Sequence, residues 1–346
     1  MRRVLLSILL LVVIAIPVNA MEFTAPPVPE DGEVYMPEEN QSFAEGLWFV
    51  IGSAVDRLLP EIAESAGACV RIVAVILLVT VVDVFPGTST PVLHLVSTVL
   101  IGVILIEPAG TLIRLGADTV VEMTEYAKLL LPVLTGALAA QGGASASVTL
   151  YAGTAFFSTV LSTMISRLIL PLLYIYICLI IVNAVTDQPL ITNLSGFIKW
   201  LICWGLKIIL YVFTGYIGIT GVISGAADAS AVKAAKLTIS AMVPVVGSII
   251  SEASETILLS AGMMKNAAGI YGIFATIALF VGPFLKIGVQ YLLLKVTAAV
   301  CTVFGSKQEN KLLEDFSGVM SMVLAMTGTV CLLLLIGVVC FLKGMS

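Results

Sequence analysis

Long apolar runs separated by short polar stretches dominate the chain from about residue 67 onward. A helix needs about 20 predominantly apolar residues to cross the hydrocarbon core of a bilayer. Runs close to that length cover residues 67–85, 91–107, 148–166, 168–186, 200–223, 267–285, 287–304 and 319–342. The pattern therefore predicts an all-α, polytopic membrane protein with about eight transmembrane helices, in a membrane domain that covers residues 67–346.

The N-terminus has the order of segments that is typical of an export signal. Arg2 and Arg3 precede an apolar run from Val4 to Val18, and a small residue follows at Ala20. This order predicts a secretory signal peptide over residues 1–20. The length of the run also fits an uncleaved membrane anchor, so both interpretations stay open.

The segment after this run is acidic. Residues 21–56 contain eight Asp or Glu residues and no Lys or Arg. Because cytoplasmic loops of membrane proteins carry an excess of Lys and Arg, residues 21–45 are predicted to form an exported tail. As a helix, residues 46–66 would have one apolar and one polar face, which predicts an amphipathic helix that lies along the membrane interface.

Two stretches, 108–147 and 224–266, are neither clear spans nor clear loops, and they share a pattern. The shared elements are GAD at 116–118, AKL at 127–129 and Pro132 in the first stretch, and GAAD at 225–228, AKL at 235–237 and Pro244 in the second. These similarities predict an internal repeat, about 91–199 and 200–320, unless they arise by chance in a chain rich in Ala, Leu and Pro. Three predicted spans separate the equivalent points, and an odd number would make the repeats inverted.

The sequence SGAADASAVKAAKLTISAMVPVVG, residues 224–247, is rich in small residues that recur four apart. Residues four apart lie on one helix face, and small ones let helices approach closely in a membrane. The candidate packing residues are Gly221, Gly225, Ala226, Ala227, Ser230, Ala231, Ala234 and Ala235. Candidates for a polar path or for partner contacts are Asp228, Lys233, Lys236, Glu252 and Glu255. We predict a helical hairpin packed against other helices or against copies of itself; an Ala-rich interfacial helix is the alternative.

Composition supports the membrane assignment. The chain is 59% hydrophobic and 11% charged, with a mean hydropathy of +1.11 and a net charge of −5. A soluble domain carries about 25% charged residues. No basic stripe indicates a nucleic-acid partner. The six cysteines show no CxxC pair, which predicts small buried apolar side chains rather than a disulfide framework or a zinc site.

Sequence signatures of catalysis are missing. The chain has no GxxxxGK[ST] nucleotide loop and no HExxH motif. A Ser–His hydrolase would have to use His94, the single histidine, and a histidine near a helix start that faces other helices is the simpler interpretation. Lys286 and Lys295 could line an aqueous path, contact a partner, or extend to the membrane surface. We expect no cofactor, no metal and no enzymatic activity.

Residues 215–269, which read GYIGITGVISGAADASAVKAAKLTISAMVPVVGSIISEASETILLSAGMMKNAAG, resemble the stage III sporulation protein AE family of endospore-forming bacteria. The resemblance implies a polytopic subunit of the channel, or feeding tube, between mother cell and forespore. It implies a place in the mother-cell-derived outer forespore membrane, with the N-terminal tail extracytoplasmic. The implied partners are membrane proteins of the same operon, a secretion-type ATPase and a forespore membrane protein. The family offers no catalytic residues to transfer.

Two functions are consistent with the residues. The first is a non-enzymatic subunit of a channel or export apparatus, and the second is a self-sufficient secondary transporter, which an inverted repeat would favour. Transporters usually bury coupling carboxylates near the membrane midplane. Here the acidic residues cluster at span ends and in the two ambiguous stretches, which favours the channel subunit.

Overall fold

The computed structural model describes residues 26–37, 43–85, 90–140, 144–186, 188–219 and 267–345. Helices are the only regular secondary structure in these ranges. They are α2 (Glu30–Glu33), α3 (Phe43–Asp83), α4 (Thr90–Ala140), α5 (Ala144–Met164), the π-helical turn η1 (Ile165–Ile169), α6 (Leu170–Thr186), α7 (Pro189–Ile219), α10 (Ala267–Phe304) and α11 (Lys307–Met345). The predicted all-α class is confirmed for the described part of the chain.

Six helical paths in these ranges are long and apolar enough to cross a membrane. The prediction of eight separate spans is not confirmed, because several predicted spans are continuous with their neighbours. Residues 148–166 and 168–186 lie on one path through α5, η1 and α6, and 267–285 and 287–304 both lie in α10. The predicted interfacial helix 46–66 likewise continues into 67–83 as α3.

Polar residues and prolines mark the predicted breaks, and the helices continue through them. Pro171 cannot donate to the carbonyl of Arg167, and its ring would crowd that carbonyl in a regular α-helix. The turn just before Pro171 is π-helical, with the backbone N–H of Leu170 bonded to the carbonyl of Ile165. A π-bulge is a known way to absorb such a mismatch without ending the helix. In α10, Pro283 also lies inside the helix.

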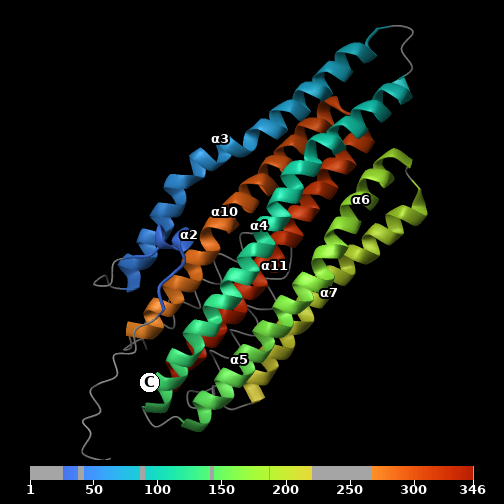
Figure 1. Ribbon diagram of the computed structural model, residues 1–346. Coiled ribbons are helices and arrows are strands. Elements are labelled where there is room, and N and C mark those ends of the chain that lie inside the picture. Colours follow the sequence, from blue (N-terminus) through green and yellow to red (C-terminus); the bar gives the residue numbers. More distant parts are fainter. Residues whose placement is uncertain are drawn as a thin grey trace, which may run out of the picture.

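The long helices lie side by side in one elongated, antiparallel bundle (Figure 1). The α3–α4, α6–α7 and α10–α11 connections lie at one end, here called the Glu309 end. Contacts that place them together include Asp83 with His94 and Ser97 with Glu309. At the opposite end, Gly344 of α11 approaches Leu138 of α4, and Gly269 of α10 approaches Leu342.

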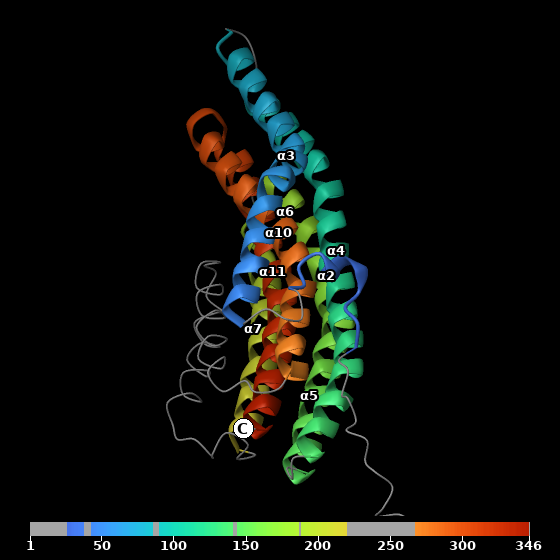
Figure 2. The ribbon, with the colours of Figure 1, turned by 90° about the vertical axis from the view of Figure 1, so that its left-hand side faces the viewer.

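Helix α11 is the centre of the bundle. It packs against α10, α4, α5, α6 and α7, and Figure 2 shows α4 and α5 on one side of it and α7 on the other. In its most apolar 18-residue window, 78% of residues are buried, against 28% to 50% for the other five helical paths. A helix that is apolar on all sides is either a core helix or a membrane span that faces lipid, and the burial of α11 shows that other helices enclose it.

The outside of the bundle is strongly apolar. Along α7, Phe197 stacks on Trp200 and Trp200 stacks on Trp204, with ring centroids 5.9 Å and 5.6 Å apart. These three side chains are 56%, 54% and 47% exposed. Such exposure suits lipid contact, and Trp is enriched where helices meet the membrane interface.

The structure changes the count on which the inverted orientation of the repeat depends. In the described part of that interval, two helical paths, 144–186 and 189–219, lie where three spans are predicted. An even number would leave the two copies in the same orientation. Pro244 of the second copy lies outside the described residues, so the internal repeat itself stays a prediction.

Candidate functional site: a polar junction at the Glu309 end

The candidate residues of the small-residue segment lie outside the part of the chain that the structure describes. This applies to the packing residues from Gly221 to Ala235 and to the polar residues from Asp228 to Glu255. Their roles therefore stay predictions. The site described below is built from other residues.

The carboxylate of Glu309 is the centre of this site. Within the described residues, Glu309 is the only acidic or basic residue that is classed as buried, with 0% relative exposure. It lies in the first turn of α11, where it accepts a hydrogen bond from the backbone N–H of Ser306 at 2.7 Å. The backbone N–H of Glu309 in turn donates to Ser306 Oγ at 3.3 Å. This reciprocal pair is a capping box, and it begins the central helix of the bundle.

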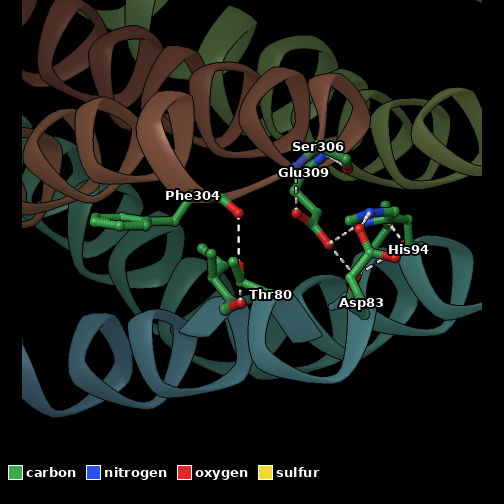
Figure 3. Close-up of polar contacts among 9 residues, drawn as sticks. Thr80, Asp83, His94, Phe304, Ser306 and Glu309 are labelled. Atoms are coloured by element: carbon green, nitrogen blue, oxygen red, sulfur yellow. Dashed lines mark hydrogen bonds and ion pairs between the residues drawn. The ribbon is translucent and has the colours of Figure 1, made fainter. Parts of the chain in front are cut away.

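The second carboxylate oxygen of Glu309 connects α11 to α4 (Figure 3). His94 Nδ1 lies 3.3 Å from Glu309 Oε1, and the Ser97 hydroxyl donates to the same oxygen. The Ser97 hydroxyl also lies 2.9 Å from the carbonyl of His94, one turn earlier in α4. The buried charge is therefore held by a backbone N–H, a hydroxyl and an imidazole, as buried charges require.

Helix α3 joins the same junction from the other side of His94. Asp83 Oδ2 lies 3.9 Å from His94 Nε2, so the imidazole lies between two carboxylates. One turn before, the Thr80 hydroxyl donates to the carbonyl of Phe304 at 2.6 Å (Figure 3). That carbonyl belongs to the last turn of α10, which lacks intrahelical donors. The junction thus ties α3, α4, α10 and α11 together at one end.

The geometry favours a structural connection over catalysis. The Ser97 hydroxyl is directed at Glu309 and at a backbone carbonyl, and both nitrogens of His94 face carboxylates. A nucleophile–base pair would need the hydroxyl and an imidazole nitrogen in contact with each other. In the described ranges, no group of three or more His, Cys, Asp or Glu residues could hold a metal ion. His94 does face other helices, as predicted.

Sequence reasoning singled out His94 but missed Glu309 and Ser97. The spacing Ser306-x-x-Glu309 just before an apolar run is the pattern of a capping box, and it was the available signal for the start of α11. Nothing in the sequence pairs Glu309 with α4, because 212 residues separate it from Ser97.

The other polar residues singled out in the sequence occupy simpler positions. Lys295 pairs with Glu314 across α10 and α11, on the surface of the bundle. Lys286 is exposed on α10. All six cysteines are free; Cys69, Cys301, Cys331 and Cys340 are buried as predicted, whereas Cys203 is half-buried and Cys178 is exposed.

The chain is similar in sequence to known proteins. A family model described as stage III sporulation protein AE matches residues 40–343. The curated stage III sporulation protein AE of Bacillus subtilis (strain 168) is 25% identical over 193 residues, which cover 56% of this chain and 48% of that protein. The match thus spans about half the length of this relative. No solved structure matches the chain.

Proposed function

The chain belongs to the stage III sporulation protein AE family, and from this membership we propose that it is a non-enzymatic membrane subunit of the channel complex between mother cell and forespore. In this proposal it serves late forespore development during endospore formation. The observation that carries the proposal is the family match over 40–343, on a bundle with six helices long and apolar enough to span a membrane.

The proposed location is the mother-cell-derived outer forespore membrane, with the acidic N-terminal tail on the extracytoplasmic side. The proposed partners are membrane proteins of the same operon, a secretion-type ATPase and a protein of the forespore membrane. An external ATPase is part of the proposal because the sequence contains no nucleotide-binding loop of the GxxxxGK[ST] type. The exposed apolar surface of α3, α4 and α7 is available for lipid and for neighbouring membrane proteins.

A self-sufficient secondary transporter is the less favoured function. Coupled transporters place ionisable groups and interrupted helices near the middle of the membrane. In the described part of this chain, the buried carboxylate of Glu309 lies at an end of the bundle and is occupied by the capping box, Ser97 and His94. The apolar residues 316–342 of α11 pass through the centre without an Asp, Glu, Lys, Arg or His side chain.

Purification from sporulating cells tests the proposal. A tagged copy replaces the native gene in an endospore-forming host, and the complex is isolated from its membranes after mild cross-linking. We expect membrane proteins of the same operon to copurify in a fixed ratio, and heat-resistant spores to be lost when the gene is deleted. A control isolation with a differently tagged multi-pass protein identifies nonspecific partners.

Reconstitution of the purified chain alone discriminates the two functions. We expect proteoliposomes that contain only this protein to show no ion-driven solute uptake. A protein that copurifies with no partner and drives uptake on its own would contradict the subunit proposal and favour the transporter.

A further inference from the structure

The outward face of α4 changes its chemistry partway along the helix. Between positions 92 and 106, all seven exposed residues are apolar: Val92, Leu95, Val96, Val99, Leu100, Val103 and Ile106. Between positions 107 and 129, six of the eight exposed residues are polar: Glu107, Thr111, Arg114, Asp118, Glu125 and Lys128. Residues three or four apart share a helix face, so both sets belong to one continuous face. Glu107 therefore marks a boundary between an apolar part and a polar part of the same face.

Helix α4 is too long to lie in lipid over its whole length. It contains 51 residues, which is about 76 Å at 1.5 Å per residue. The hydrocarbon core of a bilayer is about 30 Å thick, and transmembrane helices tilt by up to about 40°. Even at that tilt α4 would span about 58 Å, so a large part of it must lie outside the hydrocarbon. The apolar part, residues 90–106, is about 26 Å long and matches the core by itself.

Helix α3 shows the same change. Four charged side chains lie close together in its first half: Asp56, Arg57, Glu61 and Glu64. Over residues 65–82, Arg71 is the only charged side chain. Its Nε donates to the carbonyl of Gly67 at 3.3 Å, so the side chain extends back toward the charged group, as a long basic side chain does when it reaches for the membrane surface. Lys286 of the neighbouring helix α10 is exposed and lies close enough to Glu61 to interact with its charge.

The boundaries on the two helices lie at similar heights. Asp83 of α3 contacts His94 of α4 at the Glu309 end. Glu64 lies 19 residues from Asp83, and Glu107 lies 13 residues from His94, in helices that run in opposite directions. The difference of six residues corresponds to about 9 Å along the bundle. Because the headgroup layer on each side of a bilayer is about 5 to 8 Å thick, one membrane surface can pass close to both boundaries.

The reverse placement would bring the polar part of α4 into lipid. In the described part of the chain, no salt bridge joins Arg114 or Asp118 to another residue. Charged side chains in a membrane are costly, and they almost always face protein or a water-filled cavity. Two exposed charges without an ion-pair partner therefore argue against hydrocarbon around residues 107–129.

The opposite side of the bundle does not show this boundary. Helix α5 presents Val148, Phe156 and Val160, which are 63%, 61% and 37% exposed, and it contains no charged residue. The change from apolar to polar side chains is thus a property of the side formed by α3 and α4.

We propose that bilayer hydrocarbon covers the α3–α4 side only next to the Glu309 end, over residues 65–82 of α3 and 90–106 of α4. Water contacts the outward face of α4 from Glu107 to Leu129, and the charged side chains near Glu64 and Glu107 lie among the lipid headgroups. In this placement, α4 crosses the membrane once and continues as a helix with one wet face. The inference concerns the contact of this chain with lipid and does not depend on the proposed function.

Cysteine accessibility along α4 tests the placement. The six native cysteines are replaced, and single cysteines are introduced at Val103 and Leu129, which are 60% and 59% exposed. Val99→Cys and Val121→Cys form a second matched pair, at positions that are 40% and 47% exposed. The purified protein is placed in nanodiscs, in which both membrane surfaces are open, and treated with a charged, water-soluble maleimide. We expect Leu129→Cys and Val121→Cys to react several-fold faster than Val103→Cys and Val99→Cys, because hydrocarbon shields a thiol from this reagent.

A nitroxide on the same cysteines identifies what covers each position. Oxygen concentrates in lipid and a charged nickel chelate stays in water, so we expect oxygen to reach Val103→Cys and the chelate to reach Leu129→Cys. Access of oxygen but not of the chelate to Leu129→Cys would show that lipid covers the polar part, and it would overturn the placement. A label at Leu129→Cys that neither reagent reaches would show a protein contact and would overturn it as well. All four thiols should react equally in sodium dodecyl sulfate, which is the control for the reagent.

Insertion of a charge provides an independent test. Val103→Glu puts a carboxylate into the proposed hydrocarbon zone, and Val121→Glu puts one into the proposed water zone. We expect Val103→Glu to lower the amount of folded protein in membranes several-fold and Val121→Glu to leave it unchanged. Val103→Thr is the matched control without a charge. Equal losses with the two Glu variants would overturn the placement. These measurements use the chain without sporulation partners, so their failure is distinct from failure of the proposed function.

Discussion

Replacing Glu309 should weaken the bundle more than any other single polar substitution at its end. Glu309→Ala removes the acceptor for the Ser306 N–H, the Ser97 hydroxyl and the His94 imidazole at once. A buried donor that loses its acceptor costs about 1 to 3 kcal/mol. The Ser97 hydroxyl keeps the carbonyl of His94, and the His94 side chain is 24% exposed and can regain some solvation, so we expect a total of about 3 kcal/mol for this variant.

The neighbouring residues should follow in a defined order. His94→Ala and Ser97→Ala each remove one contact to Glu309, and a single hydrogen bond contributes about 0.5 to 1.5 kcal/mol. Glu314→Ala is the matched control, since it removes another carboxylate of the same helix. Its pair with Lys295 has side chains that are 46% and 40% exposed, and such a surface pair contributes about 0 to 1 kcal/mol.

The free energy of unfolding can be measured in bicelles by steric trapping or by denaturant titration in detergent micelles. Membrane insertion is checked first, so that a loss of stability is separated from a loss of protein. The reasoning would be refuted if Glu309→Ala cost no more than Glu314→Ala. It would also be refuted if His94→Ala lost as much as Glu309→Ala, because the buried charge would then not be the centre of the junction.

Three further substitutions follow from packing in the described part of the bundle. Phe316→Ala, at a fully buried ring of α11, should cost about 3 to 5 kcal/mol in the same unfolding assay. Val296→Ala, at a side chain of α10 that is 62% exposed, should cost about 0.5 kcal/mol or less. Equal losses would contradict the central position of α11. In α4, Gly116→Ala should destabilise the protein by about 1 to 3 kcal/mol, because the new Cβ would crowd Val323. Gly110→Ala, whose Cβ would meet nothing within 4 Å, should stabilise the protein by up to about 1 kcal/mol. Two changes of the same sign would refute that packing. Thr80→Val keeps the side-chain shape but removes the hydrogen bond to the carbonyl of Phe304, so it should lower the free energy of unfolding by about 1 kcal/mol. An unchanged thermal midpoint would show that water replaces this hydrogen bond.

The membrane class follows from the sequence because apolar composition is a sum over all residues and needs no knowledge of contacts. The number of helices does not follow in the same way. A window of about 20 residues treats Arg167 and Lys286 as ends of spans, because a charge is costly in lipid. In the structure both side chains are exposed on continuous helices, and at Pro171 the π-helical turn absorbs the proline. Backbone continuity at such points depends on packing around the helix, which the local pattern does not contain.

The polar junction shows a similar division. His94 could be singled out because it is the only histidine, and its position near a helix start predicts contacts with other helices. Its partners Glu309 and Asp83 come from two other helices, and only the fold brings these together. The small-residue segment, which carries the clearest sequence pattern, lies outside the described residues, so its packing stays a prediction.

The burial of α11 has a consequence for how the protein is made. This helix follows α3, α4, α5, α6, α7 and α10 in the chain, yet five of these helices pack on it. During synthesis α4 and α10, which have α11 as their main packing partner, enter the membrane before that helix exists, and lipid must cover the faces that α11 later covers. Bundle assembly is therefore completed only when α11 is inserted. Until then the nascent chain presents unmatched faces, and membrane chaperones and proteases have their longest opportunity to act on it.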